Sequence, residues 1–187
     1  MEKVGVLALQ GSFAEHLAVL SRIAGIEPVE VKTVAQLEAV DRLIIPGGES
    51  TAIGKLLKKT GMLPVLQKRI NEGMPVWGTC AGLILLAKEI VGEEPYLDAM
   101  DIAVRRNAYG GQLDSFRCAQ VIPAISVKPI PLVFIRAPWI ESVGPKAEAI
   151  AEYNGKIIAA KQGRLLATSF HPELTEDTTI YEYFLKM

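Results

Sequence analysis

Cys80 stands in the sequence Gly-Thr-Cys-Ala-Gly that begins at residue 78. An apolar run of strand length precedes this pentapeptide, and an apolar run rich in unbranched residues follows it as far as Lys88. Gly-x-Cys-x-Gly between a strand and a helix is typical of a nucleophile elbow, a sharp turn that lifts a reactive side chain above the edge of an α/β sheet. The glycines are needed where neighbouring backbone passes close to the turn. The sequence therefore predicts a strand, a sharp turn at Cys80 and a helix.

A cysteine at such a turn lies at the N-terminus of the following helix. Free backbone N–H groups and the helix dipole favour the thiolate there, and the thiolate is the reactive form. The alternative is a buried structural cysteine, because free cysteine is among the most buried residue types. The pentapeptide alone leaves both interpretations open.

Strand-like and helix-like segments alternate through the first half of the chain. We expect strands near residues 3–9, 28–32 and 42–46, and helices after residues 10–12, after residues 47–51 and over residues 63–71. Ser12 is the expected N-cap of the first helix, with Glu15 completing a capping box. Alternation at this spacing predicts an α/β fold with a mostly parallel, doubly wound sheet flanked by helices.

The second half of the chain has shorter strand-like runs and more proline and glycine. We expect strands over residues 102–105, 119–122, 131–135, 156–160 and 165–169, and a final helix over residues 177–186. No internal repeat or linker interrupts the sequence, and a length of 187 residues fits one domain. The simplest prediction is a single domain spanning residues 1–187.

Charge and composition argue against several classes of function. Lys and Arg number 20 against 21 Asp and Glu, so nothing indicates a nucleic acid or a membrane surface as partner. No charge-free apolar run reaches the roughly 18 residues of a membrane span. The first residues lack the features of a signal peptide, and we expect a cytoplasmic protein in which Cys80 and Cys118 are free thiols. No spacing resembles a zinc site.

A cysteine nucleophile needs a proton acceptor, and that base needs a third group to orient it. The chain has two histidines. His16 falls inside the first expected helix, and we expect it at the surface or in an interface. His171 follows an apolar strand and precedes Pro172, which favours extended backbone. Residues two apart face the same side of an extended chain, so Glu173 can lie beside the imidazole of His171.

Cys80, His171 and Glu173 therefore form the predicted triad. The alternative for the last two is an ordinary polar loop after a strand. Acyl chemistry also needs backbone N–H donors for the developing oxyanion. Gly48, in the Gly47-Gly48 pair after a strand, and Ala81, which follows Cys80, are the candidates, although a glycine pair can also be merely a tight turn.

The loops that carry these residues are expected to converge. In doubly wound sheets, ligands bind beyond the carboxyl ends of the strands. The loops at Gln10-Gly11, at residues 47–49 and at residues 79–81 all follow expected strands. Their convergence would join the candidate groups in one site.

With these segments located, the sequence resembles the triad (class I) glutamine amidotransferases, and within them the family of glutaminase subunits of pyridoxal phosphate synthase. The resemblance extends over essentially the whole chain. The segments that carry it are Leu9-Gln10-Gly11 with Glu15-His16, Pro46-Gly47-Gly48-Glu49-Ser50-Thr51, the Cys80 pentapeptide, Arg106-Asn107-Ala108-Tyr109-Gly110, Phe134-Ile135-Arg136-Ala137-Pro138 and residues 169–175. The resemblance implies a flavodoxin-like α/β fold of the class I glutamine amidotransferase type.

The resemblance also implies roles for individual residues. Cys80 would be the nucleophile, His171 the general acid and base, and Glu173 its orienting partner. The implied glutamine site consists of Gly47, Gly48, Glu49, Arg106, Ile135 and Arg136. Gln10 would lie near the oxyanion loop and the interface with the partner.

Within the implied site, Glu49 suits the substrate α-ammonium group, whereas guanidinium groups match its α-carboxylate. Without the resemblance, Arg106 and Arg136 would be interpreted as solvated surface charges.

The implied reaction is hydrolysis of L-glutamine through a glutamyl thioester. The ammonia passes to a synthase subunit that makes pyridoxal phosphate, and the chain itself needs no metal or cofactor. Members of this family are typically poorly active before the synthase subunit binds, so the Gly47-Gly48 peptide is expected to reorient on docking. This chain has Ala14 and Gly111 where family members usually carry arginine, which bears on how the partner docks.

Three other functions stay open on the sequence alone. The same glutaminase chemistry could serve a different synthase, although the segment around Ile135 argues against it. A cysteine peptidase-like hydrolase could use the same elbow and triad. A non-catalytic binding protein could keep the fold, but an intact Cys80, His171 and Glu173 argues against that.

Overall fold

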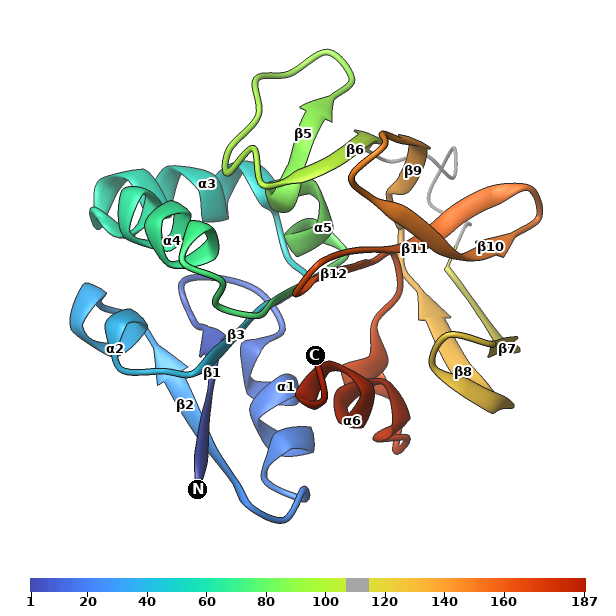
Figure 1. Ribbon diagram of the computed structural model, residues 1–187, viewed down its shortest axis with the longest axis horizontal. Helices are drawn as coiled ribbons and strands as arrows, with labels where there is room; N and C mark the ends of the chain where they lie inside the picture. Colours follow the sequence, from blue (N-terminus) through green and yellow to red (C-terminus); the bar gives the residue numbers. More distant parts are fainter. Residues whose placement is uncertain (107–114) are drawn as a thin grey trace.

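A large β-sheet organises the computed structural model, which describes residues 1–106 and 115–187 (Figure 1). The strands are β1 (Glu2–Leu7), β2 (Ile26–Val31), β3 (Arg42–Ile45), β4 (Val76–Thr79), β5 (Ala87–Ile90), β6 (Met100–Arg105), β7 (Phe116–Ile122), β8 (Ser126–Phe134), β9 (Trp139–Val143), β10 (Glu148–Tyr153), β11 (Lys156–Gln162) and β12 (Leu165–Thr168). The helices are α1 (Phe13–Leu20), α2 (Val34–Glu38), α3 (Ser50–Lys59), α4 (Met62–Asn71), α5 (Ala81–Leu86), the 3-10 helix η1 (Pro172–Leu174) and α6 (Thr179–Leu185).

The strands of the large sheet lie in the order β2-β1-β3-β4-β12-β11-β9-β6-β5, and β10 pairs with β11. The pairings β1 with β2, β1 with β3, β3 with β4, and β4 with β12 are parallel. Antiparallel strands β11 and β9 extend this parallel part, followed by the parallel pair β6 and β5. The predicted α/β class and mostly parallel sheet are confirmed.

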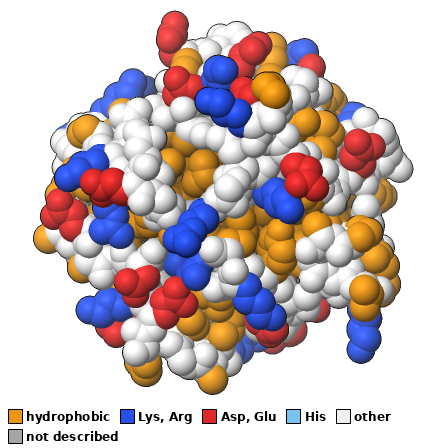
Figure 2. Space-filling view, viewed as in Figure 1, with side chains coloured by type: hydrophobic (Ala, Val, Ile, Leu, Met, Phe, Trp, Pro, Cys, Tyr) orange, Lys and Arg blue, Asp and Glu red, His pale blue; other side chains and the backbone are white. Residues whose placement is uncertain are grey.

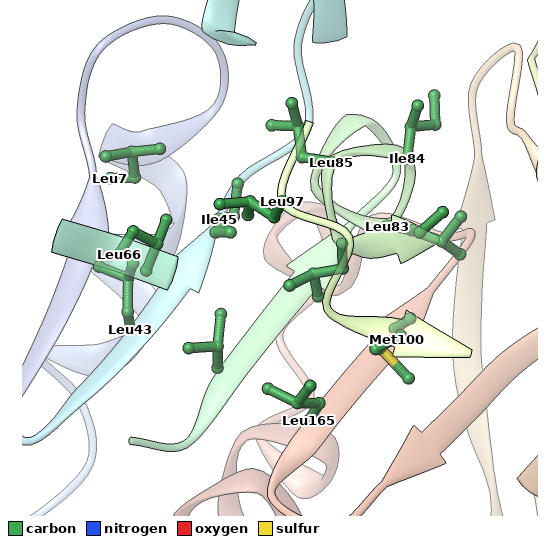
Figure 3. Packing of buried hydrophobic residues seen from close by; sticks show 14 of the residues in the cluster. Leu7, Leu43, Ile45, Leu66, Leu83, Ile84, Leu85, Leu97, Met100 and Leu165 are labelled. Carbon is green, nitrogen blue, oxygen red and sulfur yellow. The ribbon is translucent and has the colours of Figure 1, made fainter. Parts of the chain in front are cut away.

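Helices cover both faces of the sheet, and each face has its own apolar core. On one face, α2, α3, α4 and α5 pack over side chains such as Leu43 and Leu165. On the other face, α1 and α6 pack over Val6 and Trp77, together with the hairpin of β7 and β8. Figure 3 shows part of the first core from close by, with labelled side chains that come from β1, β3, α4 and α5. The two cores hold β4, the strand that ends just before Cys80, between them.

The surface view shows acidic and basic side chains interspersed over the face that is displayed (Figure 2). This pattern agrees with the near-zero net charge of −1. In the described part of the chain, no helix is both long enough and apolar enough to cross a membrane.

Several expected elements differ in detail from the observed ones. The helix after Cys80 ends at Leu86, and β5 begins at once with Ala87, so the expected helix as far as Lys88 is too long. The strands β9 and β10 and the short helix α2 were not predicted. The expected capping box is also wrong, because the Ser12 side chain makes no cap hydrogen bond to α1.

Candidate active site

The turn at Cys80 has the backbone geometry of a strained elbow. Cys80 has φ 49° and ψ −103°, a region that costs a non-glycine residue of the order of 1–3 kcal/mol. It lies between β4 and α5 and serves as the N-cap of α5. A Cβ at Gly78 would clash with the backbone of Gly82, and a Cβ at Gly82 would clash with the carbonyl of Ile45. The two glycines are therefore needed for close backbone approach, as the sequence predicted.

Cys80 opens into a cavity of about 530 Å³. This cavity lies beyond the carboxyl ends of β1, β3 and β4, because it is lined by residues of the loops that follow those strands. Its lining residues are Gln10, Gly48, Glu49, Ser50, Cys80, Ala81, Ile84, Arg106, Ile135, Arg136, Pro138 and His171. The structure thus brings most of the predicted site residues to one cavity; Gly47 and Glu173 lie just behind its wall.

His171 lies between Cys80 and Glu173. Its Nδ1 is 2.7 Å from Glu173 Oε1, which leaves Nε2 to face Cys80, the other side chain that raises the pKa of His171. His171 is the N-cap of η1 and Glu173 lies within that 3-10 helix, so the predicted contact forms on a turn rather than on extended chain. A Cβ at Gly47 would clash with the His171 ring and press on Cys80. Gly47 is therefore the residue that lets the imidazole lie close to the loop.

Two opposing effects determine the pKa of His171: burial of its ring, and its interactions with Cys80 and Glu173. Burial alone would lower the pKa, because it disfavours the charged imidazolium. The hydrogen bonds with Cys80 and Glu173 and the charges of both groups outweigh burial and raise the pKa to about 10. His171 is therefore an imidazolium at neutral pH.

Glu173 is a nearly buried carboxylate with several donors around it. Its Oε1 accepts from the Ser12 hydroxyl at 2.7 Å in addition to His171 Nδ1. Burial would raise the pKa of Glu173, but His171, His16 and Ser12 together lower it to about 2. Glu173 is thus an anion throughout the neutral range, as a group that orients an imidazole must be.

The Gly47-Gly48 loop is held by the segment after β1. The amide of Ser12 donates to the carbonyl of Gly47 at 3.0 Å, and the amide of Glu49 donates to Gln10 Oε1 at 2.8 Å. The peptide is trans, so the N–H of Gly48 points to the side opposite the Gly47 carbonyl. A Cβ at Gly48 would clash with the Gln10 side chain. Gln10 therefore braces the loop that carries the predicted oxyanion donor.

Opposite charges meet at the mouth of the cavity. Arg106 Nη2 lies 2.7 Å from Glu49 Oε1, and Arg106 Nη1 lies 2.7 Å from Glu93 Oε1. Glu49 also caps α3, because its Oε2 accepts from the amide of Ala52 at 2.9 Å. Partial burial would raise the pKa of Glu49, but the backbone hydrogen bonds and Arg106 lower it. Arg106 and Glu49 thus form an ion pair in which Glu49 is half-exposed.

Ile135 and Arg136 approach the cavity from the loop after β8. Arg136 has φ 42°, a left-handed conformation that few non-glycine residues adopt. Both residues line the cavity beside Pro138, which was not predicted as a site residue. The segment that begins at Arg106 and carries the resemblance continues with Asn107-Ala108-Tyr109-Gly110, and these four residues lie outside the described part of the chain, as does Gly111.

Sequence reasoning missed or misplaced several residues around the site. His16 was expected at the surface or in an interface, but the structure buries it completely, within reach of Glu173. Ser12 was expected to cap α1, and it binds Glu173 instead. Ser50 and Ile84 also line the cavity, and neither was predicted as a site residue, although Ser50 lies in the segment 46–51 that carries the resemblance. Over residues 1–106 and 115–187, no group of three or more His, Cys, Asp or Glu side chains is placed to hold a metal ion.

Solved structures and curated proteins resemble this chain closely. A crystal structure described as a glutamine amidotransferase superposes with a TM-score of 0.91 at 46% sequence identity, covering 98% of this chain and 97% of that one. A structure of a glutamine amidotransferase from Thermotoga maritima has a TM-score of 0.61 at 12% identity, covering 99% of this chain and 81% of that one, and supports the fold alone.

Among curated proteins, one from Caldanaerobacter subterraneus subsp. tengcongensis is 55% identical over 99% of this chain and 98% of its own length. Another, from Chloroflexus aurantiacus, is 53% identical over 98% of this chain and 99% of its own length. Both are named pyridoxal 5'-phosphate synthase subunit PdxT. The sequence profile of the SNO glutamine amidotransferase family matches residues 6–187. This chain belongs to the SNO glutamine amidotransferase family.

Proposed function

We propose that this protein is the glutaminase subunit of a pyridoxal 5'-phosphate synthase. It hydrolyses L-glutamine to L-glutamate and ammonia, and a partner synthase subunit consumes the ammonia. Family membership and the names of the relatives support this assignment. The observation that carries the chemistry is the cavity in which Cys80 and His171 lie together, with Glu173 hydrogen-bonded behind His171. We also propose that residues 1–187 form one glutaminase domain.

The cavity offers groups of the right charge for an amino acid zwitterion. The carboxylate of Glu49 would bind the α-ammonium group of glutamine, and the guanidinium groups of Arg106 and Arg136 would bind its α-carboxylate. Glu49 and Arg106 are more exposed than Cys80, which lines the same cavity. A substrate bound this way would direct its side-chain carboxamide toward the thiolate.

The proposed reaction starts from the Cys80 thiolate and the His171 imidazolium. The thiolate attacks the carboxamide carbon, and His171 donates its Nε2 proton to the leaving nitrogen, so that ammonia departs and a glutamyl thioester forms. His171 then removes a proton from a water molecule, whose oxygen attacks the thioester. Release of glutamate restores the thiolate and the imidazolium.

Two amides are proposed to hold the oxyanion. The amide of Ala81 is in the first turn of α5, where backbone N–H groups have no acceptor within the helix. The amide of Gly48 is the second donor. If docking of the synthase subunit reorients the Gly47-Gly48 peptide, the hydrogen bond from the Ser12 amide to the Gly47 carbonyl is the contact that must break. Partner-dependent activity would follow from that rearrangement.

The test is glutamate release from glutamine, measured for this chain alone and then with a pyridoxal phosphate synthase subunit. We expect activity that rises on mixing and disappears in Cys80→Ala. Cys118→Ala is the matched control, because Cys118 is a second free cysteine on β7, outside the cavity. Hydrolysis of peptides without hydrolysis of glutamine would instead assign a peptidase.

The predicted cytoplasmic location is also part of this proposal. A nucleophilic cysteine must stay reduced, and the cytoplasm keeps thiols reduced. Cys80 and Cys118 are both free thiols in the structure, which agrees with that environment.

A further inference from the structure

His16 is a buried histidine for which the reaction described above has no use. It lies on α1 and is 0% exposed. The rings of Trp77 and Tyr181 pack around it, with centroids 6.0 and 5.8 Å from the imidazole. Burying an imidazole is unfavourable unless its nitrogen atoms find polar partners. The identity of those partners indicates what His16 does.

Both ring nitrogens of His16 face polar groups. Nδ1 lies 2.7 Å from the hydroxyl of Tyr181. Nε2 lies 3.2 Å from Thr79 Oγ1 and 3.5 Å from Glu173 Oε2. The imidazole therefore connects α6 with the end of β4 and with the carboxylate behind His171.

The contacts determine which nitrogen carries the proton. Burial, together with the charge of Glu173, raises the pKa of Tyr181 far above its ordinary value, so its phenol keeps its proton. That O–H donates to Nδ1, the partner at 2.7 Å. A neutral ring then carries its proton on Nε2. In this tautomer an N–H faces the carboxylate oxygen, whereas in the other tautomer the lone pair of Nε2 would face it and repel it.

The two oxygens of Glu173 have different surroundings. Oε1 accepts from His171 and from Ser12. Oε2 is buried and has no hydrogen-bond donor at normal distance among the described residues. A buried carboxylate oxygen without a donor is costly, so a group that faces it with an N–H stabilises that orientation of the carboxylate. The Nε2 atom of His16 lies 3.5 Å from Oε2 and is the group that faces it.

We propose that His16 is a positioning residue of the triad. Held by Tyr181, it presents its Nε2–H to Glu173 Oε2 and fixes the plane of the carboxylate whose other oxygen orients His171. This inference rests on the proposed function and extends the triad by two residues, in the order Tyr181, His16, Glu173, His171, Cys80.

Burial keeps this second imidazole neutral. It lowers the pKa of His16 to about 4, while the charges of Glu173 and Glu15 raise it and that of His171 lowers it. The remaining groups that face the ring are the hydroxyls of Thr79 and Tyr181. A neutral His16 can donate a hydrogen bond to Glu173 without competing, as a cation would, for the negative charge that His171 needs.

Three variants test the positioning role in the assembled complex. In His16→Leu the donor is lost, and we expect kcat to fall about tenfold to a hundredfold with KM changed less than about twofold, since small misplacements of catalytic groups have effects of this size. In His16→Gln a neutral N–H remains, and we expect most of kcat to return. Tyr181→Phe removes only the hydroxyl that fixes the tautomer, and we expect an intermediate loss. Tyr183→Phe, on the same helix but beside a separate surface cavity, is the matched control.

The protonation state can be read without any activity measurement. The chain has two histidines, so the ring ¹⁵N spectrum of His16→Gln contains His171 alone, and subtraction from the wild type identifies His16. We expect His16 as the Nε2–H tautomer, without titration between about pH 5.5 and 8.5.

An Nδ1–H tautomer, titration of His16 near its ordinary pKa, or wild-type kcat in a folded His16→Leu would each overturn the proposal. If His16→Leu does not fold, Tyr181→Phe decides, and wild-type kcat in that variant counts against the proposal. If the wild-type complex releases no glutamate, the proposed function fails, whereas the tautomer of His16 is still decided by the spectrum.

Discussion

His171 and His16 lie on the two sides of one carboxylate, the first against Glu173 Oε1 and the second facing Oε2. Burial acts on both imidazoles in the same direction and lowers the pKa of each. In His171 the hydrogen bonds with Cys80 and Glu173 outweigh burial, and the pKa is raised to about 10. In His16 burial dominates, and the pKa is lowered to about 4.

The difference shows that proximity to a carboxylate does not by itself determine the charge of a histidine. His171 lines the cavity, lies 2.7 Å from Glu173 Oε1, and has two partners, Cys80 and Glu173, that raise its pKa. His16 is sealed among Trp77 and Tyr181 and approaches the carboxylate only at 3.5 Å. One histidine is therefore suited to carry a proton and the other to donate a fixed hydrogen bond.

Glu173→Gln should disrupt both histidine contacts at once and have the largest effect. A carboxylate accepts hydrogen bonds on both oxygens, whereas an amide accepts on one side and donates on the other. Either His171 or His16 must then face an NH₂ group and change its tautomer. We expect kcat for glutamine hydrolysis to fall about 10³- to 10⁴-fold, the size seen when the orienting acid of a triad becomes an amide. Steady-state kinetics of the complex and the histidine ¹⁵N spectrum measure the two effects.

Glu176→Gln is the matched control for this change. Glu176 lies three residues further along the chain, and its side chain is 94% exposed in an ion pair with Arg22. We expect wild-type kcat in that variant. A Glu173→Gln enzyme that kept more than about a tenth of wild-type kcat would show that the carboxylate does not orient His171.

The dependence of stability on pH should separate the two histidines. Between pH 6.5 and about 4 the unfolded chain protonates His16 and the folded chain does not, so stability falls as the pH falls. The stabilising effect of His171, whose pKa is raised to about 10, is fully present below pH 6.5 and is lost only as the pH rises toward 10. That of Glu173, whose pKa is lowered to about 2, is present above its ordinary value of 4.5 and is lost below it. The range from pH 4.5 to 6.5 therefore isolates His16.

We expect the free energy of unfolding of the wild type to fall by about 2 kcal/mol more than that of His16→Gln across this range, at about 1.4 kcal/mol per unit of pH. Urea denaturation at pH 4.5 and 6.5 for both proteins measures the difference. If the free energy of unfolding changes by the same amount in the two proteins, His16 has the same pKa in the folded and the unfolded chain.

The parallel part of the fold was predictable because its strands are continuous apolar runs. The strand expected over residues 42–46 is β3, and the helix expected over residues 63–71 is α4. The sequence did not reveal β5, because its four residues follow a helical apolar run directly and lack a turn signal. Such boundaries depend on pairing with β6, which is a tertiary contact.

The convergence of the candidate site residues was predictable where a local sequence pattern marks them. The Cys80 elbow, the segment of His171 and Glu173, and the Gly47-Gly48 loop each have a short signature, and the sheet brings them together. His16 has no such signature, because its burial depends on α6, which lies at the other end of the chain. Ser12 matches a capping pattern, but its hydroxyl donates a hydrogen bond to the carboxylate of Glu173 in η1 instead of capping α1.

Ser12→Ala should have the smallest effect among these changes. The Ser12 hydroxyl is a second donor to Glu173 Oε1, which still accepts from His171 when the hydroxyl is gone. We expect kcat to fall about threefold, unfolding to become about 1 kcal/mol easier, and the pKa of Glu173 to move back toward its ordinary value. Ser12→Thr, which retains the hydroxyl, is the control. A loss of kcat in Ser12→Ala larger than that in His16→Leu would mean that the contacts at Oε1, rather than His16 at Oε2, orient the carboxylate of Glu173.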